Sequence, residues 1–287
     1  MIETTPEGYK ILIGSDGSRT FMIDSDRLAE SISYIRGRDI RIIGINSYSG
    51  YERSEIEFLS EIADFIEGIT VLGDKFDTSV LNKLHKLKTL GFTDNGKSVI
   101  DLSNFPNLST LACEYSPRLK SLDSCGELKH LTLTGYKDKI KNLTAMPLLS
   151  SLEELSLFKT NIDTLEGIGR FRLLKKVSLF RAGQLQQIDD VRALKNTLVS
   201  IEFDQCKKIV SYEPLGELEN LLRLVLFRCH AIESLHFIKR LERLEFLSFV
   251  GTDVLDGNLS PAFGITYVGF NDKSHYSHSF KDFSARG

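Results

Sequence analysis

Residues 221–243 read LLRLVLFRCHAIESLHFIKRLER and contain one complete copy of the pattern that organises this chain. Apolar residues stand at its first, fourth and sixth positions, so the first half alternates as a short β-strand does. The second half repeats apolar residues at every third position, which suits tight helical or 3-10 turns that return the chain. Leu244 then begins the next copy.

The same L-x-x-L-x-L signature recurs eleven times, with Ile, Val, Phe or Cys replacing some of the leucines. Its first positions are Ile40, Ile66, Leu87, Leu108, Leu128, Leu152, Leu174, Leu198, Leu221, Leu244 and Ile265. Steps of 20 to 26 residues match the period of a leucine-rich repeat. One copy cannot bury its apolar face alone, so the copies must stack into a continuous core. The sequence therefore predicts an α/β leucine-rich-repeat solenoid, with a curved parallel sheet on the concave face and helices or 3-10 turns on the convex face.

The ends of such a solenoid expose an apolar cross-section, so we expect each end to be covered. Tyr9–Ile23 predicts a β-hairpin around an Asp-Gly turn. A helix should follow over Ser25–Arg36, capped by Ser25 or Asp24. We therefore divide the chain into an N-terminal capping hairpin and helix at 1–38, a solenoid of about eleven rungs at 39–270, and a C-terminal cap and tail at 271–287.

The first rungs are less regular than the later ones. Residues 46–53, NSYSGYER, read as an inserted polar loop. Ser54–Glu67 reads as a full helix on the convex side, because its apolar residues share one helical face.

Composition excludes several classes of function. The chain has 287 residues, a net charge of −3 and a pI near 6.1, which argues against a general nucleic-acid or acidic-membrane surface. It has no apolar run of membrane length, and its first residues lack the basic and apolar segments of a secretory signal. We expect a cytoplasmic protein.

The four cysteines fit the repeat frame. Cys113 occupies a framework strand position, Cys206 and Cys229 occupy the ninth position, and Cys125 lies on a return turn. We expect small core fillers. The alternative, a disulfide or zinc site, lacks C-x-x-C spacing.

Catalytic motifs are absent from the sequence: it has no phosphate-binding glycine loop, nucleophile elbow or zinc-protease motif. His275 and His278 could share a metal, but no neighbouring carboxylate or cysteine completes a ligand set, so we expect hydrogen bonds instead. The sequence predicts no enzyme activity, no cofactor, no metal and no small-molecule substrate.

Three segments carry a resemblance to a known family: Phe65–Ile69 (FIEGI), Gly251–Pro261 (GTDVLDGNLSP) and the ending Tyr267–His278. With them, nearly the full chain resembles a bacterial family of intracellular leucine-rich-repeat proteins with short, SDS22-like and internalin-like repeats. The resemblance implies that such proteins often act as immunity proteins, which neutralise a neighbouring toxin by binding it. These segments belong to the framework, so the resemblance carries over no functional residue.

A binding surface should lie on the concave sheet face. Positions three, five and seven of successive copies align there in columns, with position eight on the rim. The pairs Phe158-Lys159, Phe180-Arg181 and Phe227-Arg228 recur at positions seven and eight in three of four consecutive copies.

We predict a protein-binding patch from these columns, because aromatic residues beside arginines are typical energetic centres of interfaces. Its residues are Glu154, Phe158, Lys159, Lys176, Phe180, Arg181, Glu202, Asp204, Arg223, Phe227, Arg228, Phe246 and Tyr267. The aromatic residues would anchor the partner, the basic ones would meet its acidic groups, and the carboxylates would set the register. In one alternative the phenylalanines pack only on each other. In another, the aromatic–basic pairs contact nucleic acid, against which the interleaved carboxylates argue.

The sequence thus predicts a non-enzymatic module that occludes one protein partner, with an immunity protein bound to a toxin domain as the specific hypothesis. An SDS22-like regulatory scaffold for an enzyme, or an effector that binds a host protein, are the alternatives.

Overall fold

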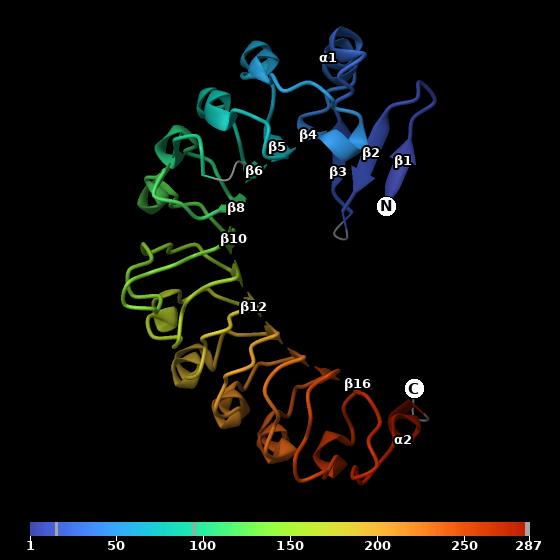
Figure 1. Cartoon of the computed structure of the whole chain (residues 1–287), viewed down its shortest axis with the longest axis vertical. Helices are drawn as coiled ribbons and strands as arrows, with labels where there is room; N and C mark the ends of the chain where they lie inside the picture. Colours follow the sequence, from blue (N-terminus) through green and yellow to red (C-terminus); the bar gives the residue numbers. More distant parts are fainter. Residues whose placement is uncertain (15–16, 94–95, 285–287) are drawn as a thin grey trace. The chain divides into compact units, whose positions relative to one another are not determined.

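The computed structural model describes residues 1–14, 17–93 and 96–284. The chain forms two compact units, Met1–His130 and Leu131–Gly287. Figure 1 labels their elements along the chain.

The first unit contains a sheet in the order β1-β2-β3-β4-β5-β6-β8. Its strands are β1 (Ile2–Thr4), β2 (Lys10–Ile13), β3 (Arg19–Met22), β4 (Ile42–Asn46), β5 (Gly68–Leu72), β6 (Thr89–Phe92) and β8 (Thr110–Glu114), with β7 (Ile100–Asp101) and β9 (Leu119–Lys120) as a separate pair. Its helical segments are α1 (Leu28–Gly37) and the 3-10 turns η1 (Ser47–Ser49), η2 (Glu57–Ile62), η3 (Thr78–Lys83), η4 (Leu102–Asn104) and η5 (Leu122–Ser124).

The predicted hairpin is present, because β2 pairs antiparallel with β3. Residues 15–16 of its turn lie outside the described residues. β1 adds a third antiparallel strand, and from β3 onward the strands pair in parallel. Tyr34 of α1 lies against Tyr9 and Phe21, with ring centroids 4.6 and 5.4 Å away, so the helix packs on the hairpin. That this pair caps a solenoid remains a prediction.

The start of the first helix was predicted wrongly. α1 begins at Leu28, and neither Ser25 nor Asp24 caps it. The Ser25 hydroxyl instead donates to the Gly50 carbonyl at 3.3 Å and accepts from the Glu52 amide at 3.0 Å. A buried side chain that already bonds a second segment is not available to a helix end.

The predicted full helix at 54–67 is also wrong, since only the short 3-10 segment η2 forms there. The buried residues at and just before η2 are Ile56, Leu59 and Ile62, which are three apart and therefore match three residues per turn. Ile66, which follows η2, is also buried. The loop before η2 is less polar than predicted. Tyr51 is fully buried there, and its hydroxyl donates to the Glu55 carbonyl.

The second unit is a regular parallel array in the order β10 to β16. Its strands are β10 (His130–Thr134), which begins at the last residue of the first unit, β11 (Glu154–Phe158), β12 (Lys176–Phe180), β13 (Ser200–Asp204), β14 (Arg223–Phe227), β15 (Phe246–Ser248) and β16 (Tyr267–Gly269). The remaining elements are η6 (Ile168–Arg170), η7 (Asp189–Leu194), η8 (Glu213–Glu217), η9 (Leu235–Arg240), η10 (Ser260–Ala262) and α2 (Phe280–Ser284). In Figure 1 its strands line one side and its 3-10 segments the other.

The strand register places the repeated leucines over one another. Leu155, Val177, Ile201, Leu224 and Leu247 form one row across β11 to β15, and all are fully buried. Each such side chain stabilises the fold by about 1.5–3 kcal/mol on burial. The chain therefore has the predicted leucine-rich-repeat solenoid fold, and a strand coincides with each copy of the signature.

In several copies the side chain at the ninth position bonds the preceding rung. The Thr160 hydroxyl donates to the Tyr136 carbonyl at 2.8 Å, and the Thr252 hydroxyl donates to the Leu226 carbonyl at 2.6 Å. The Cys229 thiol does the same with the Phe203 carbonyl, at 3.2 Å.

All four cysteines are free, and three are buried. Cys229 is only partly buried, and both it and Cys206 donate to carbonyls, so these two are polar links rather than the apolar fillers we predicted.

Candidate partner-binding face

The strand register brings the predicted site residues together on one side of the second unit. Position three forms the column Glu154, Lys176, Ser200, Arg223, Phe246 and Tyr267 across β11 to β16. Position seven forms the column Phe158, Phe180, Asp204 and Phe227, while Glu202 lies between the two columns. These side chains are half-buried or exposed, whereas the alternate residues are in the core. We call this surface, together with the position-eight residues that follow the strands, the open face.

Aromatic rings stack in two places on the open face. Phe158 lies on Phe180 with ring centroids 4.3 Å apart, and Phe246 lies on Tyr267 at 4.5 Å. Adjacent parallel strands are spaced about 4.8 Å, close to an aromatic stacking distance, so aligned rings pair between rungs. The rings of these two pairs therefore pack on each other, as both the packing alternative and a binding patch allow. Phe158, Phe180 and Phe246 nevertheless stay half-buried, and Tyr267 remains 47% exposed.

Basic groups accompany the aromatic residues. The Arg223 guanidinium lies 3.8 Å from the centroid of the Phe246 ring, and the Arg228 guanidinium lies 4.8 Å from that of Phe227. Both distances are typical of cation–π contacts, and both arginines are exposed. Aromatic and cationic character are therefore combined in one surface.

Acidic residues lie among the basic residues of the open face. Lys176 pairs with Glu154 across β11 and β12, with an N–O distance of 3.5 Å. One carboxylate oxygen of Asp204, Oδ1, is buried and has no hydrogen-bond partner among the described residues. Most buried polar side-chain atoms in folded proteins have a hydrogen-bond partner, so this oxygen is unusual. It lies in the column between Phe180 and Phe227.

Position eight has a left-handed backbone in every rung from β10 to β15. Gly135 and Gly251 occupy it in the outer rungs, with φ of 77° and 73°. The four rungs between them carry Lys159, Arg181, Gln205 and Arg228, with φ of 53°, 54°, 54° and 48°. A left-handed conformation costs a residue other than glycine roughly 1–2 kcal/mol.

A main-chain hydrogen bond accounts for this conformation. The amide of Lys159 donates to the Phe180 carbonyl at 2.8 Å, and the amide of Gly135 donates to the Phe158 carbonyl at 2.7 Å. The same bond therefore forms with either kind of residue. The turn requires the backbone conformation but not a long side chain.

Lys159, Arg181 and Arg228, which we call the rim cations, are exposed. None of them forms an ion pair or side-chain hydrogen bond with any residue that the structure describes. Some other basic side chains of this unit are paired: Lys175 bonds Glu153 at 2.6 Å and Arg240 bonds Glu213 at 2.8 Å. The rim cations thus share one turn position in their rungs and are available as hydrogen-bond donors.

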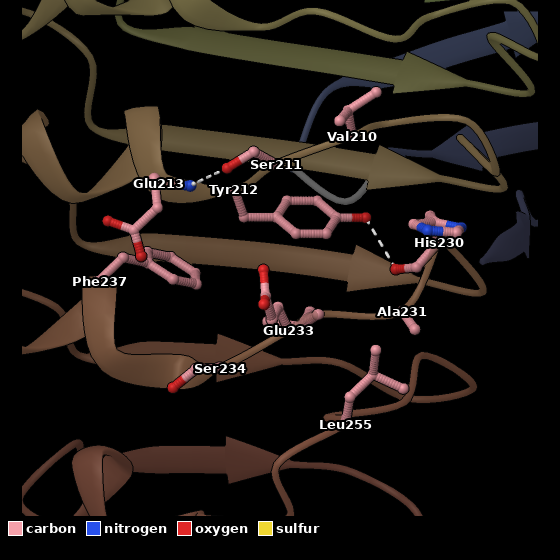
Figure 2. A pocket seen from close by; sticks show the side chains of 11 residues that line it. Val210, Ser211, Tyr212, Glu213, His230, Ala231, Glu233, Ser234, Phe237 and Leu255 are labelled. Carbon is pink, nitrogen blue, oxygen red and sulfur yellow. Dashed lines mark hydrogen bonds between the residues drawn. The ribbon is translucent and has the colours of Figure 1, made fainter.

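A pocket that no sequence motif marks lies on the flank of the same unit, after β13 and β14 (Figure 2). Its lining residues are Val210, Ser211, Tyr212, Glu213, His230, Ala231, Ile232, Glu233, Ser234, Phe237 and Leu255. The Tyr212 hydroxyl donates to the His230 carbonyl at 2.9 Å, and Glu213 is paired with Arg240. These two polar groups are therefore already engaged within the protein.

A hydrogen bond with the Cys229 thiol lowers the pKa of Cys206, but that side chain is fully buried. The pKa values of Cys125 and Cys229 shift the other way. Burial raises the pKa of the Cys125 thiol to about 11. The neighbouring Cys206 thiol, together with burial, raises the pKa of Cys229, which keeps that thiol protonated. A thiolate dyad between Cys229 and His230 therefore has no support.

Histidines near the C-terminus form the predicted hydrogen bonds. His275 Nε2 lies 3.0 Å from the Val254 carbonyl oxygen, and His278 Nδ1 lies 2.8 Å from the Ser277 hydroxyl. Across residues 1–14, 17–93 and 96–284, no group of three or more His, Cys, Asp or Glu side chains could hold a metal ion. Over the same residues, no helix has the length and apolar character needed to cross a bilayer.

Comparison with known proteins finds solved structures with a similar fold. No protein-family model matches the sequence, and no curated protein matches it. The structure of an internalin (inlF) from Listeria monocytogenes is similar, with 19% identity, a TM-score of 0.59, and coverage of 88% of this chain and 73% of the internalin. A TDR receptor is similar over 84% of this chain and 44% of its own, with 17% identity and a TM-score of 0.52. Both likenesses agree with the leucine-rich-repeat solenoid predicted from the repeats.

Proposed function

We propose that this chain is a protein-binding module that occludes one protein partner on the open face, without catalysis and without a cofactor. The observation that carries the proposal is the combination of accessible aromatic rings with unpaired rim cations on adjacent rungs. Aromatic residues and arginine contribute most of the binding free energy at typical interfaces.

Packing among the rings explains only part of this surface. Ring stacking accounts for the position of Phe158 on Phe180. It does not account for Lys159 and Arg181, which follow those rings and bond to no described side chain. An interface accounts for both, because a partner would cover the rings and supply acceptors to the cations.

The specific partner in this proposal is a bacterial toxin domain, which would make the chain an immunity protein. The resemblance of Gly251–Pro261 and Tyr267–His278 to intracellular bacterial leucine-rich-repeat proteins supports this choice. The mechanism is steric occlusion of the active site or substrate groove of the toxin. A preformed sheet face binds with little loss of conformational entropy, which favours tight binding.

The test is capture of the native partner by the full chain and by two matched variants. The first variant combines Phe180→Ala, Arg181→Glu and Arg228→Glu on the open face. The control combines Leu173→Ala, Arg172→Glu and Lys239→Glu, which are exposed residues on the 3-10 side. We expect the wild type and the control to retain the same partner, identified by mass spectrometry, and the open-face variant to lose it. Retention by the open-face variant would exclude this face.

Growth assays separate the possible partners. A toxin partner should arrest growth when expressed alone, and co-expression of the wild type but not of the open-face variant should restore growth. Capture of an enzyme from the same cell, with a change in the activity of that enzyme, would instead indicate a regulatory scaffold. Capture of a protein from a eukaryotic host would indicate an effector.

A further inference from the structure

We infer that the rim cations Lys159, Arg181 and Arg228 form a dedicated binding column for an acidic segment of a partner protein. This inference rests on the proposed function and specifies the chemistry of the partner. It depends on the backbone conformation, the charge and the register of the rim cations.

The backbone conformation shows that the fold does not need these side chains. Gly135 and Gly251 occupy the same turn position in the outer rungs and adopt the same left-handed conformation without a Cβ. The Lys159 amide forms its bond to the next rung as the Gly135 amide does. Long cationic side chains are therefore kept at positions where glycine would be less strained, and strain of this kind typically accompanies function.

The charges point to an acidic partner. The rim cations are exposed and unpaired within the described residues, whereas Lys176 on the same face is paired with Glu154. Covering an arginine without supplying an acceptor would leave its donors unsatisfied. Carboxylates of the partner would satisfy these donors with charge-assisted hydrogen bonds.

The arrangement favours a polypeptide over a nucleic acid. Glu202 and Asp204 lie within the face, on the strand that precedes Gln205. A phosphate backbone carries a charge at every nucleotide and would be repelled by this central strand. A polypeptide can place its carboxylates only opposite the cations and its apolar residues opposite Phe158 and Phe180.

The register sets the length of the acidic segment. Lys159 and Arg228 are separated by three rungs, which corresponds to about 14 Å at the spacing of parallel strands. About three turns of an α-helix or five residues of an extended strand cover this distance. Two or three carboxylates on one side of such a segment would match the column.

The test uses a random copolymer of glutamate and tyrosine as the probe, because it presents carboxylates and aromatic rings together. Binding to the full chain is measured by fluorescence anisotropy, with a single-stranded oligonucleotide of equal charge as the comparison. One variant replaces the three rim cations by glycine. A second replaces them by glutamine, which matches Gln205 at the same backbone conformation. The control is Gln205→Gly, which relaxes the turn without changing the charge.

We expect the wild type to bind the copolymer more tightly than the oligonucleotide, and its affinity to fall with salt. Both triple variants should lose about tenfold or more in affinity, which is the loss of a few exposed charge contacts. Gln205→Gly should bind as the wild type does. The glycine triple variant should keep its unfolding temperature or raise it by about 1–3 °C.

Three results would overturn the inference: wild-type affinity for the copolymer no greater than for the oligonucleotide, unchanged copolymer binding by both triple variants, or a clear fall in unfolding temperature for the glycine variant. The last result would give the side chains a structural role. If the triple variants still capture the native partner and the Phe180→Ala combination does not, the proposed function stands and only this inference fails.

Discussion

Thr252 links two neighbouring rungs through a single hydroxyl. Its Oγ1 donates to the Leu226 carbonyl at 2.6 Å and accepts from the Cys229 amide at 2.8 Å. The first bond is buried and the second is partly buried, so valine at this position would leave a carbonyl and an amide without these partners.

Thr252→Val should therefore lower the free energy of unfolding by about 2–4 kcal/mol, measured by urea denaturation. Thr132→Val is the matched control, because Thr132 is a strand residue with a half-exposed side chain. We expect the control to change stability by less than about 0.5 kcal/mol. Equal effects of the two substitutions would mean that the hydroxyl bonds of Thr252 contribute nothing.

Tyr51 should make stability depend on alkaline pH. Burial raises the pKa of Tyr51 from its ordinary value of 10.0 to about 12. Between these pH values the unfolded chain loses the phenolic proton and the folded chain keeps it, so unfolding is favoured as pH rises. Below about pH 10 both states are protonated, and the stabilisation is fully present.

The measurement is the urea midpoint between pH 8 and pH 11.5 for the wild type and for Tyr51→Phe. The wild type should lose more stability than the variant above about pH 10. Parallel loss in both proteins would assign the alkaline transition to other groups.

At the scale of the element, close approach of two 3-10 segments depends on Gly216 in η8. A Cβ on this residue would lie 2.8 Å from the Phe237 carbonyl oxygen in η9 and would also meet the Arg240 guanidinium. The arginine can move, but the carbonyl belongs to the main chain of the neighbouring rung.

Gly216→Ala should consequently destabilise the second unit by about 1–3 kcal/mol, seen as a lower thermal midpoint. Gly183→Ala is the control, since a Cβ there meets no heavy atom within 4 Å. We expect the control to be neutral or slightly stabilising. A neutral Gly216→Ala would show that the two segments separate at little cost.

The elements differ in how far they follow from the sequence. Strand positions and register follow directly, because the leucine spacing repeats and each strand has one buried face. The helix expected at 54–67 relied on residues four apart, whereas the three-residue spacing of Ile56, Leu59 and Ile62 marks the 3-10 segment that forms. Burial of Tyr51 could not be predicted, because it depends on how an irregular loop folds back on the core.

The columns of the open face could be predicted from the sequence, but the pairing of its charged side chains could not. Spacing alone places Phe158 and Phe180 at equivalent positions. Which cations remain unpaired depends on the rotamers of long side chains, which repeat periodicity does not encode. The left-handed turns could have been anticipated, since Gly135 and Gly251 stand at position eight in the outer rungs.

At the scale of the whole molecule, a solenoid is held together by contacts between neighbouring rungs. Leu224 is fully buried in the central row of the second unit, between Ile201 and Leu247. Leu224→Ala should cost about 2–5 kcal/mol. The lost protection should be concentrated near the substituted rung rather than spread evenly.

Amide hydrogen exchange measures this distribution. In Leu224→Ala, amides of β13 to β15 should exchange faster than in the wild type, with a smaller change in β11. Leu148→Ala, at a residue that is 57% exposed, should leave exchange unchanged. A uniform increase throughout the second unit would instead indicate a single cooperative block.

In the turns that carry the rim cations, the atoms that hold the fold differ from the atoms that would contact a partner. Each turn is held by a bond between main-chain atoms of adjacent rungs, such as the amide of Arg181 and the carbonyl of Asp204, 2.7 Å apart. The side chain that projects from the turn takes no part in that bond. The side chains of this column can therefore be substituted one rung at a time. Single substitutions can then change the target that the chain binds while the fold is unchanged.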